Sequence, residues 1–240
     1  MNLNPIVAIH QPNFFPWLGY FNKIIRSDIF IVLDHVQFPK KGGTWMNRAK
    51  IIIQGKEHWF TIPVKRNYSG MKNVNEIELD NVKNWKTDLM KTLKINYSSA
   101  THISETLALL KDLISFECNL LSDFNLNIIY KLCETFNIST DKFKISSKLS
   151  PQSYATDMLI DLVRKVEGKS YLCGGGASKY QEDEKFEAQG INLIYQNFQQ
   201  PVYVQSNSKD VISGTSIIDV LMNCGVDGTL EIISKFQKTS

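Results

Sequence analysis

Short apolar runs alternate with segments of helical periodicity along most of the chain. Runs rich in β-branched and aromatic residues predict strands, and apolar positions that recur every three or four residues predict helices. The predicted strands cover 6–10, 29–34, 45–53, 58–64, 143–145, 170–173 and 191–195. The predicted helices cover 17–26, 85–97, 103–113, 120–136 and 155–166, and a further one begins at 216.

Strands that alternate with helices indicate an α/β fold with a mostly parallel, Rossmann-like sheet. The two strand-like runs within 45–64 flank a short turn, which predicts an inserted β-hairpin. The helices within 84–136 form an additional helical region. We therefore divide the chain into three parts: an N-terminal α/β half with the hairpin (1–80), the helical region (81–140), and a C-terminal α/β half on the same sheet (141–240).

Composition narrows the class of protein without naming a function. The chain has 240 residues, 43% of them hydrophobic, and a net charge of +3, which is too weak to indicate nucleic-acid binding by itself. Its four cysteines form no CxxC pair, so we expect no zinc site or other metal. Neither a secretory signal nor a membrane-spanning apolar stretch is evident. We expect a cytoplasmic protein that uses no cofactor and no membrane.

Polar residues follow the first two predicted strands, where open α/β sheets bind their ligands. His10-Gln11-Pro12-Asn13 ends the first strand, and Asp34 follows the second. We predict that His10 and Asp34 are catalytic and that one or the other acts as the general base. The alternative is that these side chains only satisfy local turns, which Asp does often. The further substrate-binding residues predicted here are Gln11, Asn13 and Gln37.

The hairpin and its approach carry a second candidate set. Lys40 and Arg48 have the charge to hold a diphosphate, and Trp45 or Trp17 can form an apolar wall against a base or sugar. Because side chains alternate along a strand, we expect Trp45 and Asn47 on one face of the hairpin and Arg48 on the other. The alternative is ordinary surface charge.

Three glycines follow the predicted strand 170–173. Glycines there allow a ligand to approach the backbone closely, although the run matches neither GxxxxGK[ST] nor GxGxxG. A plain turn between strand and helix is the alternative. The substrate-binding residues predicted in this stretch are Gly174, Gly175, Gly176 and Tyr180. A second turn, Ser146-Ser147-Lys148, is a weaker candidate for binding phosphate.

Together these segments resemble the WbqC-like family. The resemblance rests on Ala8-Ile9-His10-Gln11-Pro12-Asn13, Phe15-Pro16-Trp17-Leu18-Gly19-Tyr20-Phe21, Asp34-His35-Val36-Gln37-Phe38, Asn47-Arg48, Pro63-Val64, Gly174-Gly175 with Tyr180, and Ser216-Ile217-Ile218-Asp219 with Asn223-Cys224-Gly225. Many members of that family lie in gene clusters for surface polysaccharide or modified-sugar synthesis. The resemblance therefore implies a role on activated sugars, in O-antigen or other lipopolysaccharide biosynthesis.

A more distant similarity is to the nucleotidylyltransferase superfamily, whose HxGH motif stabilises phosphates. The aligned residues here are Trp17-Leu18-Gly19-Tyr20, which lack both histidines and make adenylyl transfer doubtful. Our hypothesis is a transferase that moves an acyl or aminoacyl group to the amine of a nucleotide-linked sugar. Two alternatives stay open: a non-catalytic nucleotide-sugar binding protein, and aminoacyl transfer from a charged tRNA. The sequence identifies neither the sugar nor the donor, and it does not give the oligomeric state.

Overall fold

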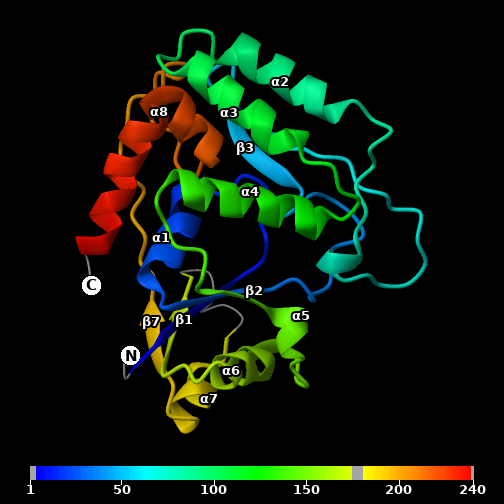
Figure 1. Cartoon of the computed structure of the whole chain (residues 1–240), viewed down its shortest axis with the longest axis vertical. Coiled ribbons are helices and arrows are strands. Elements are labelled where there is room, and N and C mark those ends of the chain that lie inside the picture. The colour runs from blue at the N-terminus through cyan, green and yellow to red at the C-terminus, as the bar shows by residue number, and fades with distance from the viewer. Residues whose placement is uncertain (1–3, 175–180, 239–240) are drawn as a thin grey trace.

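The computed structural model describes residues 4–174 and 181–238 (Figure 1). Its strands are β1 (Ile6–His10), β2 (Ile29–Val32), β3 (Arg48–Ile53), β4 (Lys56–Thr61), β5 (Phe143–Ile145), β6 (Ser170–Cys173) and β7 (Asn192–Tyr195). Its α-helices are α1 (Leu18–Arg26), α2 (Trp85–Asn96), α3 (Ile103–Ser115), α4 (Leu121–Thr135), α5 (Ser146–Leu149), α6 (Ala155–Lys165), α7 (Asp183–Ala188) and α8 (Ile217–Ser234).

Five strands form one sheet in the order β5-β2-β1-β6-β7, and every neighbouring pair is parallel. The chain builds outward from β1 through β2 to β5, and then returns across β1 to add β6 and β7. The direction of winding therefore reverses between β1 and β6. In open α/β sheets this reversal opens a crevice at the carboxyl ends of the two strands.

Helices cover both faces of the sheet, as parallel strands require. On one face, Ala8 and Phe30 join a large core with α1, α4 and α8. On the other face, Val7 and Ile31 pack with residues of α6 and α7. Figure 1 shows this arrangement, with α6 and α7 below the strands and α1 and α4 above them. Because both faces are buried, the strands read as nearly continuous apolar runs.

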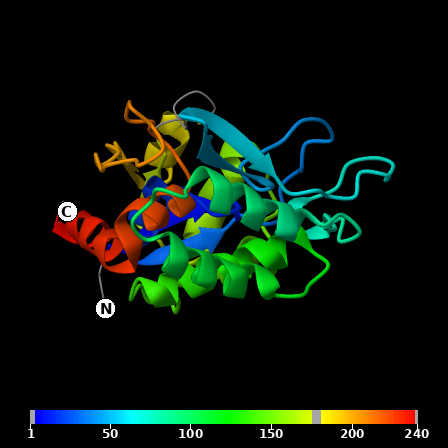
Figure 2. The ribbon, with the colours of Figure 1, turned by 90° about the horizontal axis from the view of Figure 1, so that it is seen from above.

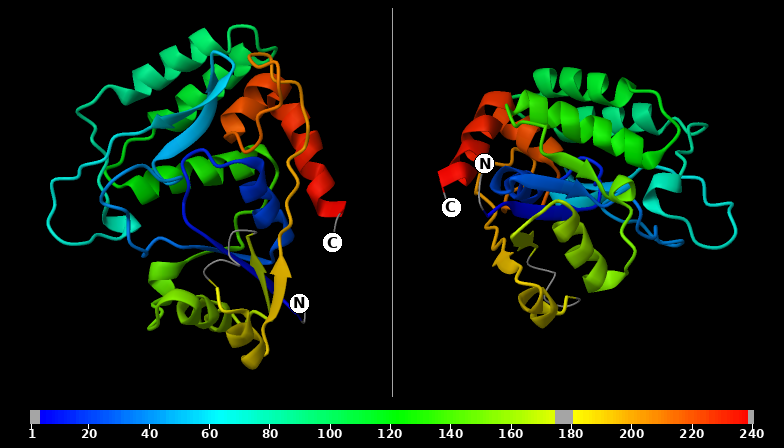
Figure 3. Two further views of the ribbon diagram at one scale, coloured as in Figure 1. Left: turned by 180° about the vertical axis from the view of Figure 1, so that it is seen from behind. Right: turned by 60° about the horizontal axis from the view of Figure 1, so that its bottom comes forward.

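The antiparallel hairpin β3–β4 stands apart from the sheet, on the side of the helical region (Figure 2). The backbone N–H of Ile52 in β3 donates to the hydroxyl of Tyr97, which follows α2, at 3.0 Å. From behind, β7 is seen at one edge of the sheet, as the strand order requires (Figure 3). Within the described ranges, no helix has the length and apolarity needed to cross a membrane.

The predicted fold class is confirmed, with its parallel sheet, separate hairpin and helical region. Two predicted strand boundaries in the hairpin are wrong: the segment 45–47 is a turn, so β3 begins only at Arg48, and β4 ends at Thr61 rather than at 64. The side chain of Asn47 accepts the backbone N–H of Thr44 at 2.9 Å, and the hydroxyl of Thr44 accepts that of Met46 at 3.0 Å. These side-chain bonds to the backbone compete with strand pairing, so the expected alternation of Trp45 and Arg48 does not apply.

Candidate active site

The carboxyl ends of β1 and β6 meet where the winding reverses. The last paired residues of these strands are Ala8 and Leu172, so Ile9 lies just beyond the ladder. The ammonium of Lys23, on α1, donates to the Ile9 carbonyl at 2.9 Å. Lys23 therefore places a buried amine at the parting of the two strands, the position where such folds bind ligands.

His10, the last residue of β1, is half-buried. Its Nδ1 lies 3.1 Å from the Gln11 carbonyl, and a carbonyl only accepts, so Nδ1 carries the proton. Burial first, and then the charge of Lys23, lowers the pKa of His10 to about 3. The ring is therefore neutral at physiological pH, with its lone pair on Nε2.

Lys23 is itself an unusual group, because its side chain is almost wholly buried. Burial lowers the pKa of Lys23 to about 8. Its nitrogen lies 6.0 Å from the centre of the Tyr171 ring, and Cys173 also acts on it electrostatically. Burial raises the pKa of the Cys173 thiol, so a thiolate nucleophile is disfavoured there.

An aromatic wall, which we define as Trp17, Trp45 and Trp59, extends from His10 to the hairpin. The His10 and Trp17 ring centres are 5.6 Å apart. Trp17 lies 4.8 Å from Trp45, and Trp45 lies 4.6 Å from Trp59. The guanidinium of Arg48 stacks on Trp59 at 4.1 Å. The structure thus joins four residues predicted from sequence, His10, Trp17, Trp45 and Arg48, through one series of contacts.

The amides predicted to bind substrate differ in their surroundings. Asn13 is only 1% exposed, and neither its amide nitrogen nor its oxygen has a partner in the described structure. Buried polar atoms of this kind call for a ligand or water partner. Asn47 is also buried, but it is occupied with the Thr44 N–H and the Ile62 carbonyl. The backbone carbonyl of Gln11 is held by His10 and by the Tyr20 hydroxyl.

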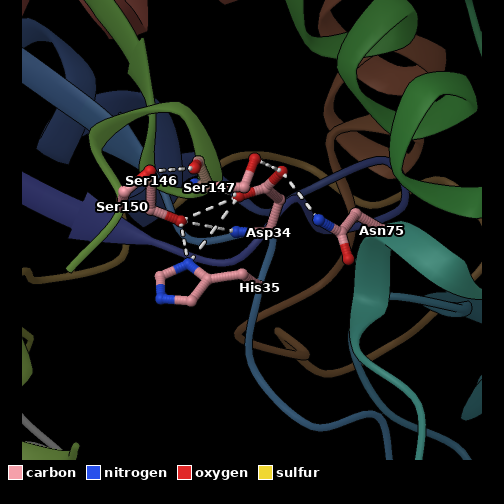
Figure 4. Close-up of polar contacts among 6 residues, drawn as sticks. All are labelled: Asp34, His35, Asn75, Ser146, Ser147 and Ser150. Atoms are coloured by element: carbon pink, nitrogen blue, oxygen red, sulfur yellow. Dashed lines mark hydrogen bonds and ion pairs between the residues drawn. The ribbon is translucent and has the colours of Figure 1, made fainter. Parts of the chain in front are cut away.

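Asp34 lies beyond the ends of β2 and β5 rather than between β1 and β6. Figure 4 shows its polar contacts. One carboxylate oxygen accepts the Ser146 hydroxyl at 2.8 Å and the Ser147 N–H at 2.9 Å. The other accepts the Ser147 hydroxyl at 2.6 Å and the Asn75 amide at 3.4 Å. Asp34 therefore occupies the start of α5, the serine turn considered for phosphate. These bonds favour a structural role for Asp34, which ties the end of β2 to the start of α5. Its catalytic role stays a prediction.

Gln37 and Lys40 are exposed on the loop between β2 and β3. The Lys40 ammonium lies over the Tyr68 ring at 5.8 Å, so it stacks on a different aromatic residue from Arg48. Arg66 fixes this loop by donating to the carbonyls of Lys40 and Gly42 at 2.6 and 2.7 Å. That Lys40 and Arg48 bind the same diphosphate stays a prediction.

The glycine run is described only at its start. Gly174 follows β6 directly, and a Cβ built there would have nothing within 4 Å, which is consistent with an open backbone. Gly175, Gly176 and Tyr180 lie outside the described residues.

Sequence reasoning missed Lys23, Tyr20 and Trp59 as parts of this site. Lys23 reads as one more polar position of an amphipathic helix, and Trp59 as one more aromatic residue of a strand. A buried lysine has no distinct sequence signal. For Trp59 the sequence does carry a signal. Its distance from the hairpin turn pairs it with Lys50, on the face of the hairpin that also carries Arg48.

Comparison with known proteins agrees with this assembly of motifs. The model of the WbqC-like protein family matches residues 11–231. Uncharacterized protein Rv1507c of Mycobacterium tuberculosis is 27% identical over 222 residues, covering 92% of this chain and 94% of that protein. No solved structure matches the chain. Since the family model extends over most of the sequence, from the exit of β1 into α8, the chain belongs to the WbqC-like protein family.

Proposed function

We propose that this protein is a transferase that moves an acyl or aminoacyl group to the amine of a nucleotide-linked sugar, for surface polysaccharide synthesis. One observation carries the proposal most: the aromatic wall, with Arg48 stacked on it, adjoins a neutral histidine near the reversal of the sheet. Aromatic faces suit a base or sugar ring, and a guanidinium suits a diphosphate. The proposal that the substrate carries a sugar follows from the family resemblance rather than from these contacts.

In the proposed reaction the sugar amine attacks the carbonyl carbon of the acyl donor. A C–N bond forms, and the bond from that carbon to the donor's leaving group breaks. His10 Nε2 takes the proton from the attacking nitrogen and returns it to the leaving group. The negative diphosphate of the substrate would raise the pKa of His10 toward a useful range, because an opposite charge favours the imidazolium.

The experiment combines binding with product detection. The protein is screened with nucleotide sugars by thermal shift, since a ligand of the folded state raises the melting temperature. Candidate acyl thioesters and aminoacyl esters are then added, and the products are analysed by mass spectrometry. We expect a product whose mass exceeds that of the nucleotide sugar by one acyl group. Binding without any product would instead support the non-catalytic alternative.

His10→Asn tests the mechanism, because the variant removes Nε2 while keeping a polar side chain. We expect turnover to fall about 100-fold or more, with nucleotide-sugar affinity nearly unchanged. His58→Asn is the matched control, since His58 is exposed on β4. Wild-type turnover in His10→Asn would remove His10 from the reaction.

A further inference from the structure

Two side chains of α1 reach back to the exit of β1. Tyr20 and Lys23 lie three residues apart, and side chains at that spacing share a helix face. The Lys23 ammonium donates to the Ile9 carbonyl at 2.9 Å, and the Tyr20 hydroxyl donates to the Gln11 carbonyl at 3.1 Å. These carbonyls flank His10 in the chain. The backbone on both sides of His10 is therefore held by one helix.

The same contacts act on the His10 ring. Its Nδ1 donates to the Gln11 carbonyl that Tyr20 already holds. The Tyr20 ring packs edge-on against the imidazole at 4.7 Å between centres, and Trp17 packs against it from the same helix end. A fixed acceptor and two aromatic neighbours limit rotation of the ring. This geometry fixes the proton on Nδ1 and leaves the lone pair on Nε2.

The titratable side chains described around the His10 ring supply a positive charge and no negative charge near neutral pH. Lys23 is the positive group, and Tyr171 and Cys173 of β6 are the titratable groups that act on it. Burial raises the pKa of both, so neither supplies a negative charge near neutral pH. On α1, Tyr20 is equally uncharged, because burial raises its pKa. A positive charge beside an imidazole disfavours the imidazolium.

We propose that Lys23 and Tyr20 are positioning residues for His10. Tyr20 holds the Gln11 carbonyl that fixes the proton on Nδ1 and the lone pair on Nε2, and the charge of Lys23 adds to burial in keeping the ring neutral. The proposal rests on the proposed function only in that Nε2 then has a substrate proton to take. The state of the ring is a property of the ligand-free protein. It is therefore measurable without any substrate.

Ring ¹⁵N NMR of histidine-labelled protein tests this directly, with His10→Asn used to assign the signal. In the wild type at pH 7 we expect a neutral His10 protonated on Nδ1. Lys23→Met removes the charge and should raise the His10 titration midpoint by about one unit or more. Lys23→Arg keeps the charge and should leave the midpoint near that of the wild type. Tyr20→Phe should mix the two neutral forms.

Lys142→Met is the matched control. Lys142 also donates to carbonyls of α1 and its end, to Ile24 at 2.7 Å and to Ser27 at 2.8 Å, but it does not act on His10. A charged or Nε2-protonated His10 in the wild type at pH 7 would overturn the proposal without any variant. An unchanged midpoint in folded Lys23→Met would overturn the role of Lys23. The expected spectra with no acyl transfer would count against the proposed function alone.

Discussion

At the scale of single residues, Arg48 is held by stacking rather than by an ion pair. Its guanidinium lies 4.1 Å from the centre of Trp59, and no carboxylate of the described chain lies within ion-pair distance of it. Its Nε is buried without a partner in the same part of the structure. Stacking leaves the charge uncompensated, which suits a group that must bind an anion.

Arg48→Ala should therefore weaken binding of a nucleotide sugar by about tenfold or more, because a charge-assisted hydrogen bond contributes about 1.5–3 kcal/mol. Isothermal titration calorimetry measures the change in affinity. Lys65→Ala is the control, since Lys65 is exposed and paired with Glu78. Equal affinities in the two variants would show that Arg48 does not contact the ligand.

Asp34, in contrast to Arg48, has a fully compensated charge, because each of its carboxylate oxygens accepts two hydrogen bonds. We expect Asp34→Asn to lower the free energy of unfolding by about 1–3 kcal/mol, since an amide cannot accept all of them. Urea denaturation measures this loss. Ser147→Ala should show a smaller loss of the same kind. Full stability with abolished turnover in Asp34→Asn would instead establish the catalytic role predicted from sequence.

At the scale of elements, α8 contains a kink with a clear cause. Gly225 has φ 66° and ψ −174°, a conformation that only glycine adopts readily. A Cβ at this position would lie 2.5 Å from both His102 Nδ1 and Glu105 Oε1, at the start of α3. The kink thus lets α3 approach the backbone of α8 closely.

Gly225→Ala should lower the free energy of unfolding by more than about 1 kcal/mol, through backbone strain and the close approach of α3. Gly228→Ala, one turn further on, is the control. Its Cβ would meet only the Cβ of Cys224 at 3.1 Å, in a helical backbone that favours alanine. Urea midpoints of the two variants compare them. Equal stabilities would mean that α8 straightens without cost.

At the scale of the whole molecule, one buried carboxylate joins distant parts of the chain. Asp219 of α8 accepts the hydroxyl of Tyr97 at 2.8 Å and that of Tyr203 at 2.6 Å. Tyr97 in turn accepts the backbone N–H of Ile52 in the hairpin. The main core likewise contains Phe14, Leu89 and Leu221, one from each of the three parts expected from sequence.

Because these parts share one core, we expect a single cooperative unfolding transition. Differential scanning calorimetry should give a van't Hoff enthalpy close to the calorimetric enthalpy. A matching midpoint from tyrosine absorbance would support the same conclusion. Two separated transitions would show instead that the helical region or the C-terminal half unfolds alone.

The elements and the fold class could be predicted from sequence, but the order of the strands in the sheet could not, for physical reasons. Apolar runs such as 170–173 are local signals, so β6 was predicted with the bounds it has. The pairing of β6 with β1 depends on contacts between distant segments, which no local pattern encodes. The helices α5 and α7 are too short to show a repeating pattern of apolar residues, so no pattern predicts them. The site shows the same split: His10 and Trp17 were predicted, whereas the burial of Lys23 required the fold.

The aromatic wall has a practical consequence for the study of this protein. Of its four tryptophans, three form the wall, and the remaining one, Trp85, is buried in the helical region. Three of the four tryptophan fluorophores therefore lie at the proposed site. A ligand that stacks there should quench or shift that emission without any added label. Tryptophan fluorescence can therefore report directly on ligand binding at the proposed site.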